Sequence, residues 1–261
     1  MPVAFSPHVH IPFQRIPEYI SLIAERRLNL EIYFNADCLD ALTLADLSRA
    51  RADLSYGPSL SFHAPFMDLC PAAIDSRIRE ATIARFTQIF DVAEVLRPKA
   101  IVFHSGYEKW KYSLSVSPWL ENSVELWTPF IERAKRLGMT IAIENIFEDE
   151  PSSLRMLMEA AGSEHFGICF DTGHFNLFST VPLETWLCEL GKYIVELHLH
   201  DNDRSADQHL PIGEGVFDFE KLFEALRGRE CINTIENHAP DRVLLSLQRL
   251  AALTSKASTD S

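Results

Sequence analysis

Short apolar segments alternate with helical patterns along nearly the whole chain, and this alternation limits the possible folds more than any other feature. Segments typical of strands occur at about 4–8, 28–34, 59–63, 100–104, 140–144, 167–171, 194–200 and 232–236. The clearest helical patterns occur at about 75–96, 117–137, 152–161, 218–227 and 241–254. Eight strand–helix units in regular order predict a parallel sheet that closes into a barrel.

The length of the chain agrees with that fold. A barrel of this kind typically needs about 250 residues, and the chain has 261. We therefore expect an α/β protein with one (β/α)8 TIM-barrel domain over residues 1–255 and a flexible tail over 256–261. An open doubly wound sheet is the alternative, but no phosphate-binding GxGxxG motif follows the first strand.

Charge and cysteine content disfavour several classes of protein. The formal net charge is −13, whereas proteins that bind duplex nucleic acid need basic surface, so we do not expect a nucleic acid partner. No apolar run approaches the roughly 18 residues of a membrane span, and the start lacks a secretory signal. Five scattered cysteines without CxxC spacing are typical of a reduced, cytoplasmic protein. The oligomeric state stays open, and a homo-oligomer is compatible with the sequence.

Side chains able to bind a divalent metal recur along the chain, nearly all where a predicted strand ends. The nine are His63, His104, Glu144, Asp171, His174, His198, Asp207, His209 and Glu236. In most of these strands bulky apolar residues occupy alternate positions, as in Ile141-Ala142-Ile143-Glu144. The bulky face suits a layer of helices. The other face then points into the barrel and ends at its carboxyl-terminal rim, where sites on this fold lie.

We expect Glu144, Asp171, His198 and Glu236 to form the central metal site. Three carboxylates and an imidazole suit Mn²⁺, Zn²⁺, Co²⁺ or Fe²⁺, while the histidine argues against Ca²⁺. One carboxylate at a strand end is more often a helix cap or a surface ion pair. Four converging groups without a metal would repel and desolvate one another, however, so a structural role alone is disfavoured.

The remaining candidates would complete two further sites. These sites consist of His63 and His104 with Glu144 bridging, and of His174, Asp207 and His209. Alternatively, some of these histidines bind substrate or hydrogen-bond to the carboxylates. One to three ions are therefore expected, manganese or zinc above all. One ion would leave the carboxylates net negative, which suits a neutral sugar, whereas three would favour a phosphate and activate water.

Two further residues are candidates for contact with substrate. His8 faces inward on the first predicted strand, although a histidine buried in the core is an equally good interpretation. Lys109 lies in Tyr107-Glu108-Lys109-Trp110-Lys111, a basic and aromatic loop suited to a phosphate or to stacking on a sugar. An ordinary solvated loop is the alternative there.

The motifs at the strand ends resemble those of the superfamily of sugar (phosphate) isomerases and epimerases with a xylose-isomerase-like TIM barrel. This superfamily, AP endonuclease family 2, also contains endonuclease IV. The motifs are Ser61-Phe62-His63-Ala64-Pro65, Phe103-His104-Ser105-Gly106, Ile143-Glu144-Asn145, Phe170-Asp171-Thr172-Gly173-His174, His198-Leu199-His200-Asp201-Asn202, Asp207-Gln208-His209-Leu210-Pro211-Ile212-Gly213-Glu214-Gly215 and Ile235-Glu236-Asn237. They cover most of the barrel and are specific for the superfamily rather than for a substrate.

The resemblance implies one of two metal arrangements. In the endonuclease branch three zinc ions are bound, and all nine corresponding positions are present here. In the isomerase and epimerase branch the four central residues hold one metal, commonly manganese. There Glu144 and Glu236 also act as an acid–base pair, since one removes a proton next to a carbonyl and a proton returns elsewhere.

The function that we expect is that of a metal-dependent isomerase or epimerase acting on a small sugar, sugar phosphate or polyol in carbohydrate metabolism. A multinuclear zinc-dependent phosphoesterase or hydrolase is the alternative, with an abasic-site nuclease as a special case. The acidic charge, and loops expected to be short after the strands, argue against DNA repair. A metal-binding barrel without turnover is a third interpretation, disfavoured because both glutamates are present.

Overall fold

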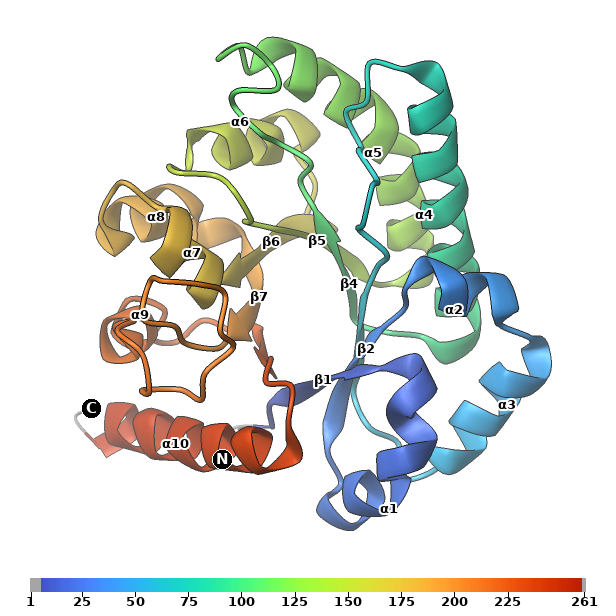
Figure 1. The fold of residues 1–261 in the computed structure, drawn as a ribbon, viewed down its shortest axis with the longest axis vertical. Helices are drawn as coiled ribbons and strands as arrows, with labels where there is room; N and C mark the ends of the chain where they lie inside the picture. The colour runs from blue at the N-terminus through green and yellow to red at the C-terminus, as the bar shows by residue number, and fades with distance from the viewer. Residues whose placement is uncertain (1–5, 260–261) are drawn as a thin grey trace.

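Eight parallel strands pair in chain order, and β8 pairs with β1, so the sheet closes into a barrel (Figure 1). The structure is a computed structural model that describes residues 6–259, with side chains described as far as residue 255. The strands are β1 His8–Pro12, β2 Asn29–Tyr33, β3 Leu60–His63, β4 Ala100–His104, β5 Thr140–Glu144, β6 Phe166–Asp171, β7 Ile194–Leu199 and β8 Ile232–Ile235. The predicted (β/α)8 barrel is confirmed.

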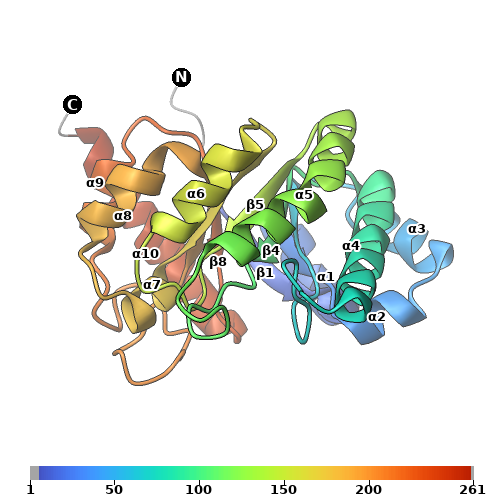
Figure 2. The same cartoon turned by 90° about the horizontal axis from the view of Figure 1, so that it is seen from above.

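Helices form a layer around the outside of the barrel (Figures 1 and 2). They are α1 Ile16–Arg26, α2 Ala36–Ala41, α3 Leu44–Asp53, α4 Ser76–Leu96, α5 Ser117–Leu137, α6 Ser152–Ala161, α7 Thr172–Phe178, α8 Leu183–Leu190, α9 Phe219–Ala225 and α10 Pro240–Thr259, with short 3-10 turns at Phe13–Arg15 and Gly191–Tyr193. Within residues 6–259, no helix has both the length and the apolar character needed to cross a bilayer.

The ends of the chain differ from expectation or lie partly outside the described residues. Helix α10 continues to Thr259, beyond the predicted end near residue 254. Residues 260–261, and the side chains from residue 256 onward, lie outside the described part of the chain. The flexible tail over 256–261 therefore stays a prediction.

The first strand begins at His8, where we expected it to end, and residues 1–5 lie outside the described residues. It pairs in register with β2, from His8 opposite Asn29 to Pro12 opposite Tyr33. The alternation of His8 and His10 with apolar residues continues past the predicted strand end, and this signal was available in the sequence. As a result, His8 lies at the amino-terminal end of the barrel instead of at the rim.

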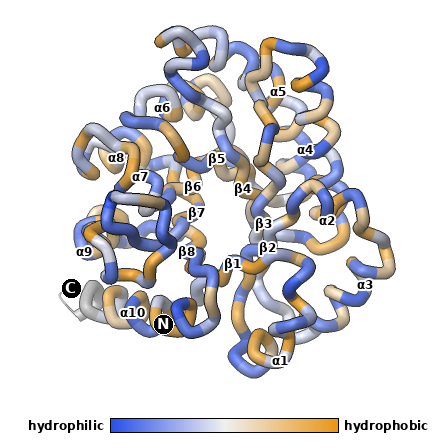
Figure 3. The backbone as a smooth tube through the Cα atoms, in the orientation of Figure 1, coloured by the Kyte–Doolittle hydropathy of each residue, from blue (hydrophilic) through white to orange (hydrophobic). Residues whose placement is uncertain are grey.

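Figure 3 colours the backbone by hydropathy, and apolar residues occur along the barrel strands. Their side chains form two separate groups. Phe103 and Ile143 are buried in the large core between the sheet and the helices. Val102, Ala142 and Cys169 form a small, fully buried cluster of their own. This division agrees with the predicted parity and leaves the ends of the inner faces free for polar side chains.

Three loops at the carboxyl ends of strands are longer than expected. Residues 64–75 join β3 to α4, residues 105–116 join β4 to α5, and residues 200–218 join β7 to α9. The last of these loops is organised by Asp201, a fully buried residue. Its carboxylate accepts four main-chain N–H bonds of 2.9–3.1 Å, from Asn202, Gly213, Gly215 and Phe217. The expectation of short loops after the strands is therefore wrong for these three.

Replacing Phe103 by alanine should lower the free energy of unfolding by about 3–5 kcal/mol, because the change leaves a cavity in the core. Phe103 is 1% exposed, and its ring centroid lies 4.6 Å from that of Phe86 and 5.1 Å from that of Trp127. Chemical denaturation measures the loss. The matched control is Phe147→Ala, at a phenylalanine that is 55% exposed, and it should cost far less. Equal losses in the two variants would contradict this account of the core.

Candidate metal centre

The carboxyl-terminal rim of the barrel gathers the predicted ligands. His63, His104, Glu144 and Asp171 are the last residues of β3, β4, β5 and β6. His198 lies in β7, Glu236 directly follows β8, His174 lies in α7, and Asp207 and His209 lie in the loop after β7. Three sets of ligand atoms at the rim each lie within 4.8 Å of one another: His63, His104 and Glu144; Glu144, Asp171, His198 and Glu236; and His200, Asp207 and His209.

Glu144 lies between two of these sets and turns one carboxylate oxygen toward each. Its Oε2 lies 3.2 Å from His63 Nε2 and 3.4 Å from His104 Nε2. Its Oε1 lies 3.3 Å from His198 Nδ1 and 3.2 Å from His174 Nδ1. A carboxylate in this position can bridge two cations, which is the role that we expected for it.

Three carboxylates surround one nitrogen of His198. Its Nδ1 lies 3.2 Å from Glu236 Oε2, 3.3 Å from Glu144 Oε1 and 3.7 Å from Asp171 Oδ2. The other nitrogen, Nε2, lies 2.8 Å from a carboxylate oxygen of Glu31 and donates its hydrogen there. In the neutral ring, Nδ1 then presents a lone pair to three anionic oxygens, which is unfavourable unless a cation lies between them.

A second observation also fits a cation at this point. Among the described residues, Glu236 Oε2 is a buried oxygen without a hydrogen-bond partner. Leaving such an oxygen unpaired is costly, whereas a bound cation would satisfy it. The donor set of three carboxylates and an imidazole therefore fits a divalent transition metal.

Three other histidines of the rim are also held by an acceptor behind the ring. His63, His174 and His209 each place Nδ1 within 2.9–3.1 Å of a main-chain carbonyl oxygen, to which it donates. In the neutral rings the Nε2 atoms would then carry the lone pair, and they face Glu144 or Asp207. Histidines that bind metals are commonly held by such an acceptor behind the ring.

The third set contains a histidine that we did not predict. His209 Nε2 lies 3.0 Å from Asp207 Oδ2, and His174 Nε2 lies 3.6 Å from the same oxygen. His200 stacks on His209 with ring centroids 4.0 Å apart, and its buried Nδ1 has no hydrogen-bond partner among the described residues. A Cβ atom at Gly173 would lie 2.0 Å from the His200 ring, so only glycine allows this approach. The inward parity that His200 shares with His198 was the available signal.

The carboxylates at the rim need compensating positive charge, as the pKa values of the cluster indicate. Burial raises the pKa of Asp171, but the charges of His174 and His200, together with hydrogen bonds from His198 and His200, outweigh burial and bring the pKa to about 2. Burial lowers the pKa of His63, whereas its hydrogen bond to Glu144 and the charge there raise the pKa to about 9. The carboxylates are therefore ionised, and either protonated histidines or bound cations must balance them.

Glu31 is a second residue of the centre that was not predicted from the sequence. It is fully buried inside the barrel, and its two carboxylate oxygens each lie 2.8 Å from a histidine, His10 Nδ1 and His198 Nε2. A carboxylate between Leu30 and Ile32 on a predicted strand was a signal of an inward-facing acid. Glu31 fixes which nitrogen of His198 faces the metal centre.

His8 does not lie where a contact with substrate was expected. Its Nδ1 donates to Ser61 Oγ at 2.9 Å, and Ser61 Oγ donates to Glu196 Oε1 at 2.9 Å. Thr234 donates to the same oxygen of Glu196 at 2.7 Å. Burial lowers the pKa of His8 to about 4, so the ring is neutral in this network. The network lies below the rim, and the position of His8 supports a structural role instead of substrate binding.

Lys109 lies in the loop after β4, as expected, and is already paired. Its ammonium group forms an ion pair with Asp149 and lies 5.7 Å from the ring centroid of Trp110. Its side chain is 37% exposed, so a ligand at the rim can still reach it. Lys109 stays a candidate for contact with substrate.

Glu31→Gln should lower the affinity of the centre for its metal by about 10- to 100-fold, because the residue holds the His198 ring in place. Isothermal titration of metal into chelator-treated protein measures the effect. Circular dichroism of the metal-free variant separates this effect from misfolding. Unchanged affinity in a folded variant would show that His198 does not depend on Glu31.

Removing bound metal with a chelator should lower the melting temperature, because a ligand that binds only the folded state stabilises it. At a metal concentration of about 100 times Kd the stabilisation is about 2.7 kcal/mol, which corresponds to roughly 5–10 °C for a chain of this size. Differential scanning fluorimetry with and without added Mn²⁺ or Zn²⁺ measures the shift. In Glu144→Gln, which loses charge from two sets of ligands, the shift should be much smaller. A protein purified without chelator that contains no metal and shows no shift would contradict the assignment.

Comparison with known proteins places this geometry in a family. The model of the xylose isomerase-like TIM barrel family matches residues 31–253. An uncharacterized protein of Methanocaldococcus jannaschii is 33% identical over 192 residues, which are 70% of this chain and 65% of that protein. The match therefore spans slightly less than two thirds of that relative.

Solved structures show the same architecture. A protein of Thermus thermophilus, whose structure was obtained after soaking with ZnCl2, is 27% identical with a TM-score of 0.81. A D-tagatose 3-epimerase-like protein is also 27% identical, with a TM-score of 0.82, and in both cases the match covers 97% of this chain and 99% of the other. Sugar epimerases and an endonuclease IV at 17% identity or less share the fold. The chain belongs to the xylose isomerase-like TIM barrel family.

Proposed function

We propose that the protein is a metal-dependent isomerase or epimerase of a small sugar, sugar phosphate or polyol. The observation that carries the proposal is the approach of two glutamates to one point, since Glu144 Oε1 and Glu236 Oε2 lie 3.3 and 3.2 Å from His198 Nδ1. Proton transfer next to a carbonyl needs a base at the carbon and stabilisation of the charge that develops on oxygen. One carboxylate of the pair would supply the base, and a cation bound at the centre would stabilise the charge on oxygen. The D-tagatose 3-epimerase-like protein among the similar structures supports this reaction class.

The two glutamates reach the centre from different parts of the barrel, because Glu144 ends β5 and Glu236 follows β8. In the proposed reaction one carboxylate removes the proton from the carbon beside the carbonyl. The electron pair of that C–H bond forms a carbon–carbon double bond, and the carbonyl oxygen takes up the negative charge. In an epimerase a proton then returns to the other face of the same carbon, and the carbonyl forms again. In an isomerase a proton returns instead to the former carbonyl carbon, the hydroxyl on the first carbon loses its proton to become the new carbonyl, and the former carbonyl oxygen takes up a proton.

The residues of the centre would have two further roles, namely to hold the ion and to remove the first proton. A manganese or zinc ion held by Glu144, Asp171, His198 and Glu236 would stabilise negative charge on the substrate oxygens. The Glu236 side chain is 12% exposed and that of Glu144 is 2% exposed, so Glu236 is the more accessible base. We assign the first proton removal to Glu236.

Groups around the rim favour an uncharged substrate within this class. Tyr33 and Phe66 stack on each other with centroids 5.8 Å apart, beside His63, and offer an aromatic surface to a sugar ring. Lys109 remains a proposed contact for substrate, but its ion pair with Asp149 reduces the positive charge available to a phosphate.

The state of the cysteines indicates the kind of compartment in which such an enzyme would act. All five are free, and Cys38, Cys70 and Cys169 are buried. Free thiols are typical of a reducing compartment, which supports a cytoplasmic location as part of the proposal.

A multinuclear zinc-dependent phosphoesterase is the second candidate, and the grouping of the ligands favours it. His63 and His104 face Glu144, while His209 faces Asp207, so ligands for more than one ion are assembled. Three tightly held zinc ions in each chain would favour this function over simple proton transfer. The net charge of −13 disfavours nucleic acid as the substrate.

Glu236→Gln should slow the incorporation of solvent deuterium into the substrate by about 100-fold or more, because it removes the proposed base. A screen of pentoses, hexoses and their phosphates identifies the substrate, with an abasic oligonucleotide as the negative control. Deuterium incorporation is followed by NMR, and the metal content of the same sample is measured because Glu236 is also a ligand. The matched control is Glu230→Gln, at an exposed glutamate that precedes β8. Normal exchange in Glu236→Gln would defeat the mechanism.

A further inference from the structure

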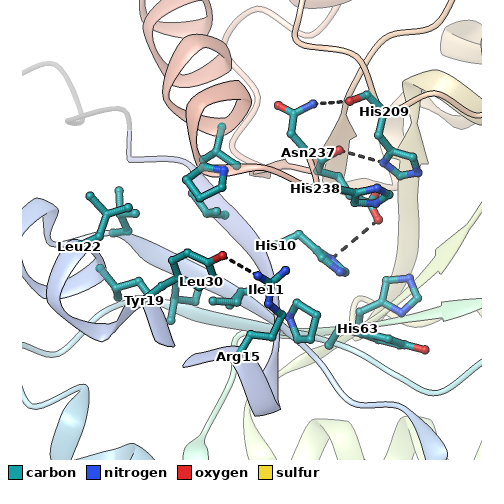
Figure 4. A pocket seen from close by; sticks show the side chains of 18 of the residues that line it. His10, Ile11, Arg15, Tyr19, Leu22, Leu30, His63, His209, Asn237 and His238 are labelled. Carbon is teal, nitrogen blue, oxygen red and sulfur yellow. Dashed lines mark hydrogen bonds and ion pairs between the residues drawn. The ribbon is translucent and has the colours of Figure 1, made fainter. Parts of the chain in front are cut away.

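A pocket of about 460 Å³ leads from the metal centre into the space between α1 and α10 (Figure 4). We name it the α1–α10 pocket. At the metal centre its wall includes His63, His209 and Glu236. Farther out, its wall includes Leu22 of α1 and Leu244 of α10. Its volume is within the roughly 300–1,000 Å³ of pockets that bind small molecules.

The pocket is polar at one end and apolar at the other. In Figure 4, His63 and His209 lie on one side of His10, while Tyr19 and Leu22 lie on the opposite side. The His10 ring lies between the polar end and the apolar end. Its Nδ1 is 2.8 Å from a carboxylate oxygen of Glu31. A ligand that fills the whole pocket would therefore need one polar end and one apolar end.

Among the described side chains that line the outer end of the pocket, the charged one, Arg15, is already paired. Arg15 there forms an ion pair with Glu18, with Nε 3.1 Å from Oε2. The same guanidinium group donates to Tyr19 Oη at 2.5 Å and lies 4.9 Å from the centroid of that ring. Because Glu18 already neutralises Arg15, this end is poorly suited to a phosphate or a carboxylate.

The apolar wall has surface left for a ligand. Leu22 and Leu244 are half-buried, but neither is among the described side chains that pack against the main core. A free sugar would place hydroxyl groups against these side chains and lose hydrogen bonds to water. An alkyl or aryl group would instead bury apolar surface there.

We propose that the substrate carries an alkyl or aryl substituent, and that this substituent fills the α1–α10 pocket while the polyol part reaches the metal centre. The proposal rests on the proposed function for the nature of the polar part. Beyond the proposed function, it states that an alkyl or aryl substituent is attached to the polyol and that this substituent binds in the α1–α10 pocket. The residues shared by the pocket and the metal centre, His63, His209 and Glu236, connect the two ends.

Binding of 1,2-alkanediols to the metal-loaded protein tests the proposal without requiring turnover. The diol represents the polar end, and alkyl chains of increasing length, from butanediol to octanediol, probe the pocket. Each added methylene should tighten binding about threefold to fourfold. Ligand-observed NMR and isothermal titration measure the dissociation constants. In Leu244→Trp, whose indole would fill the pocket, most of this dependence on chain length should be lost.

The matched control is Leu245→Trp on the same helix, because Leu245 is also half-buried but does not line the pocket. This variant should keep the wild-type dependence on chain length. No dependence in the wild type, or an equal dependence in Leu244→Trp and Leu245→Trp, would overturn the proposal. Removal of the metal should weaken all the diols by a similar factor, and unchanged binding would refute the placement of the polar end.

The outcomes for the pocket and for the reaction can be told apart. If chain length governs binding but no sugar or sugar derivative exchanges deuterium, the proposed reaction fails and the pocket stands. If deuterium exchange occurs while chain length has no effect on binding, the proposed reaction stands and the pocket does not hold the substituent.

Discussion

The convergence of ionised carboxylates at the mouth of the barrel is the constraint on which the rest of the site depends. Glu144, Asp171 and Glu236 all lie within 3.7 Å of a single nitrogen of His198. Such a group is stable only with compensating positive charge. His63 and His209 are held from behind by main-chain carbonyls and His198 by Glu31, so that the neutral rings would turn lone pairs toward the carboxylates. This arrangement supports the proposed binding of divalent cations at the rim.

The rigidity of the frame makes this concentration of charge possible. Phe103 and its aromatic neighbours fill the space between the sheet and the helices, while Val102 and Ala142 fill part of the barrel interior. Asp201 holds the long loop after β7 through four main-chain N–H groups. That loop carries the candidate ligands Asp207 and His209 to the rim, so the contacts of Asp201 with the main chain help to position them.

Most of the barrel and the gathering of most candidate ligands at its rim could be predicted from the sequence, because side chains on a strand alternate with a period of two. In Ile141-Ala142-Ile143-Glu144 the isoleucines face the helices, and Glu144 must then face the interior at the strand end. Parallel strands bring such ends to one rim. The pattern was less decisive for β1, where histidines alternate with apolar residues and the strand end was placed at His8 instead of Pro12.

By itself, the sequence determined the closed barrel and the rim at which the ligands meet, since both follow from local periodicity and chain order. Only the tertiary structure decided which oxygen of Glu144 faces which histidine, and that Glu31 holds His198 across a separation of 167 residues. It also decided that a pocket lies between α1 and α10, from opposite ends of the chain. Contacts of this kind depend on how distant elements pack, and no local pattern of residues encodes them.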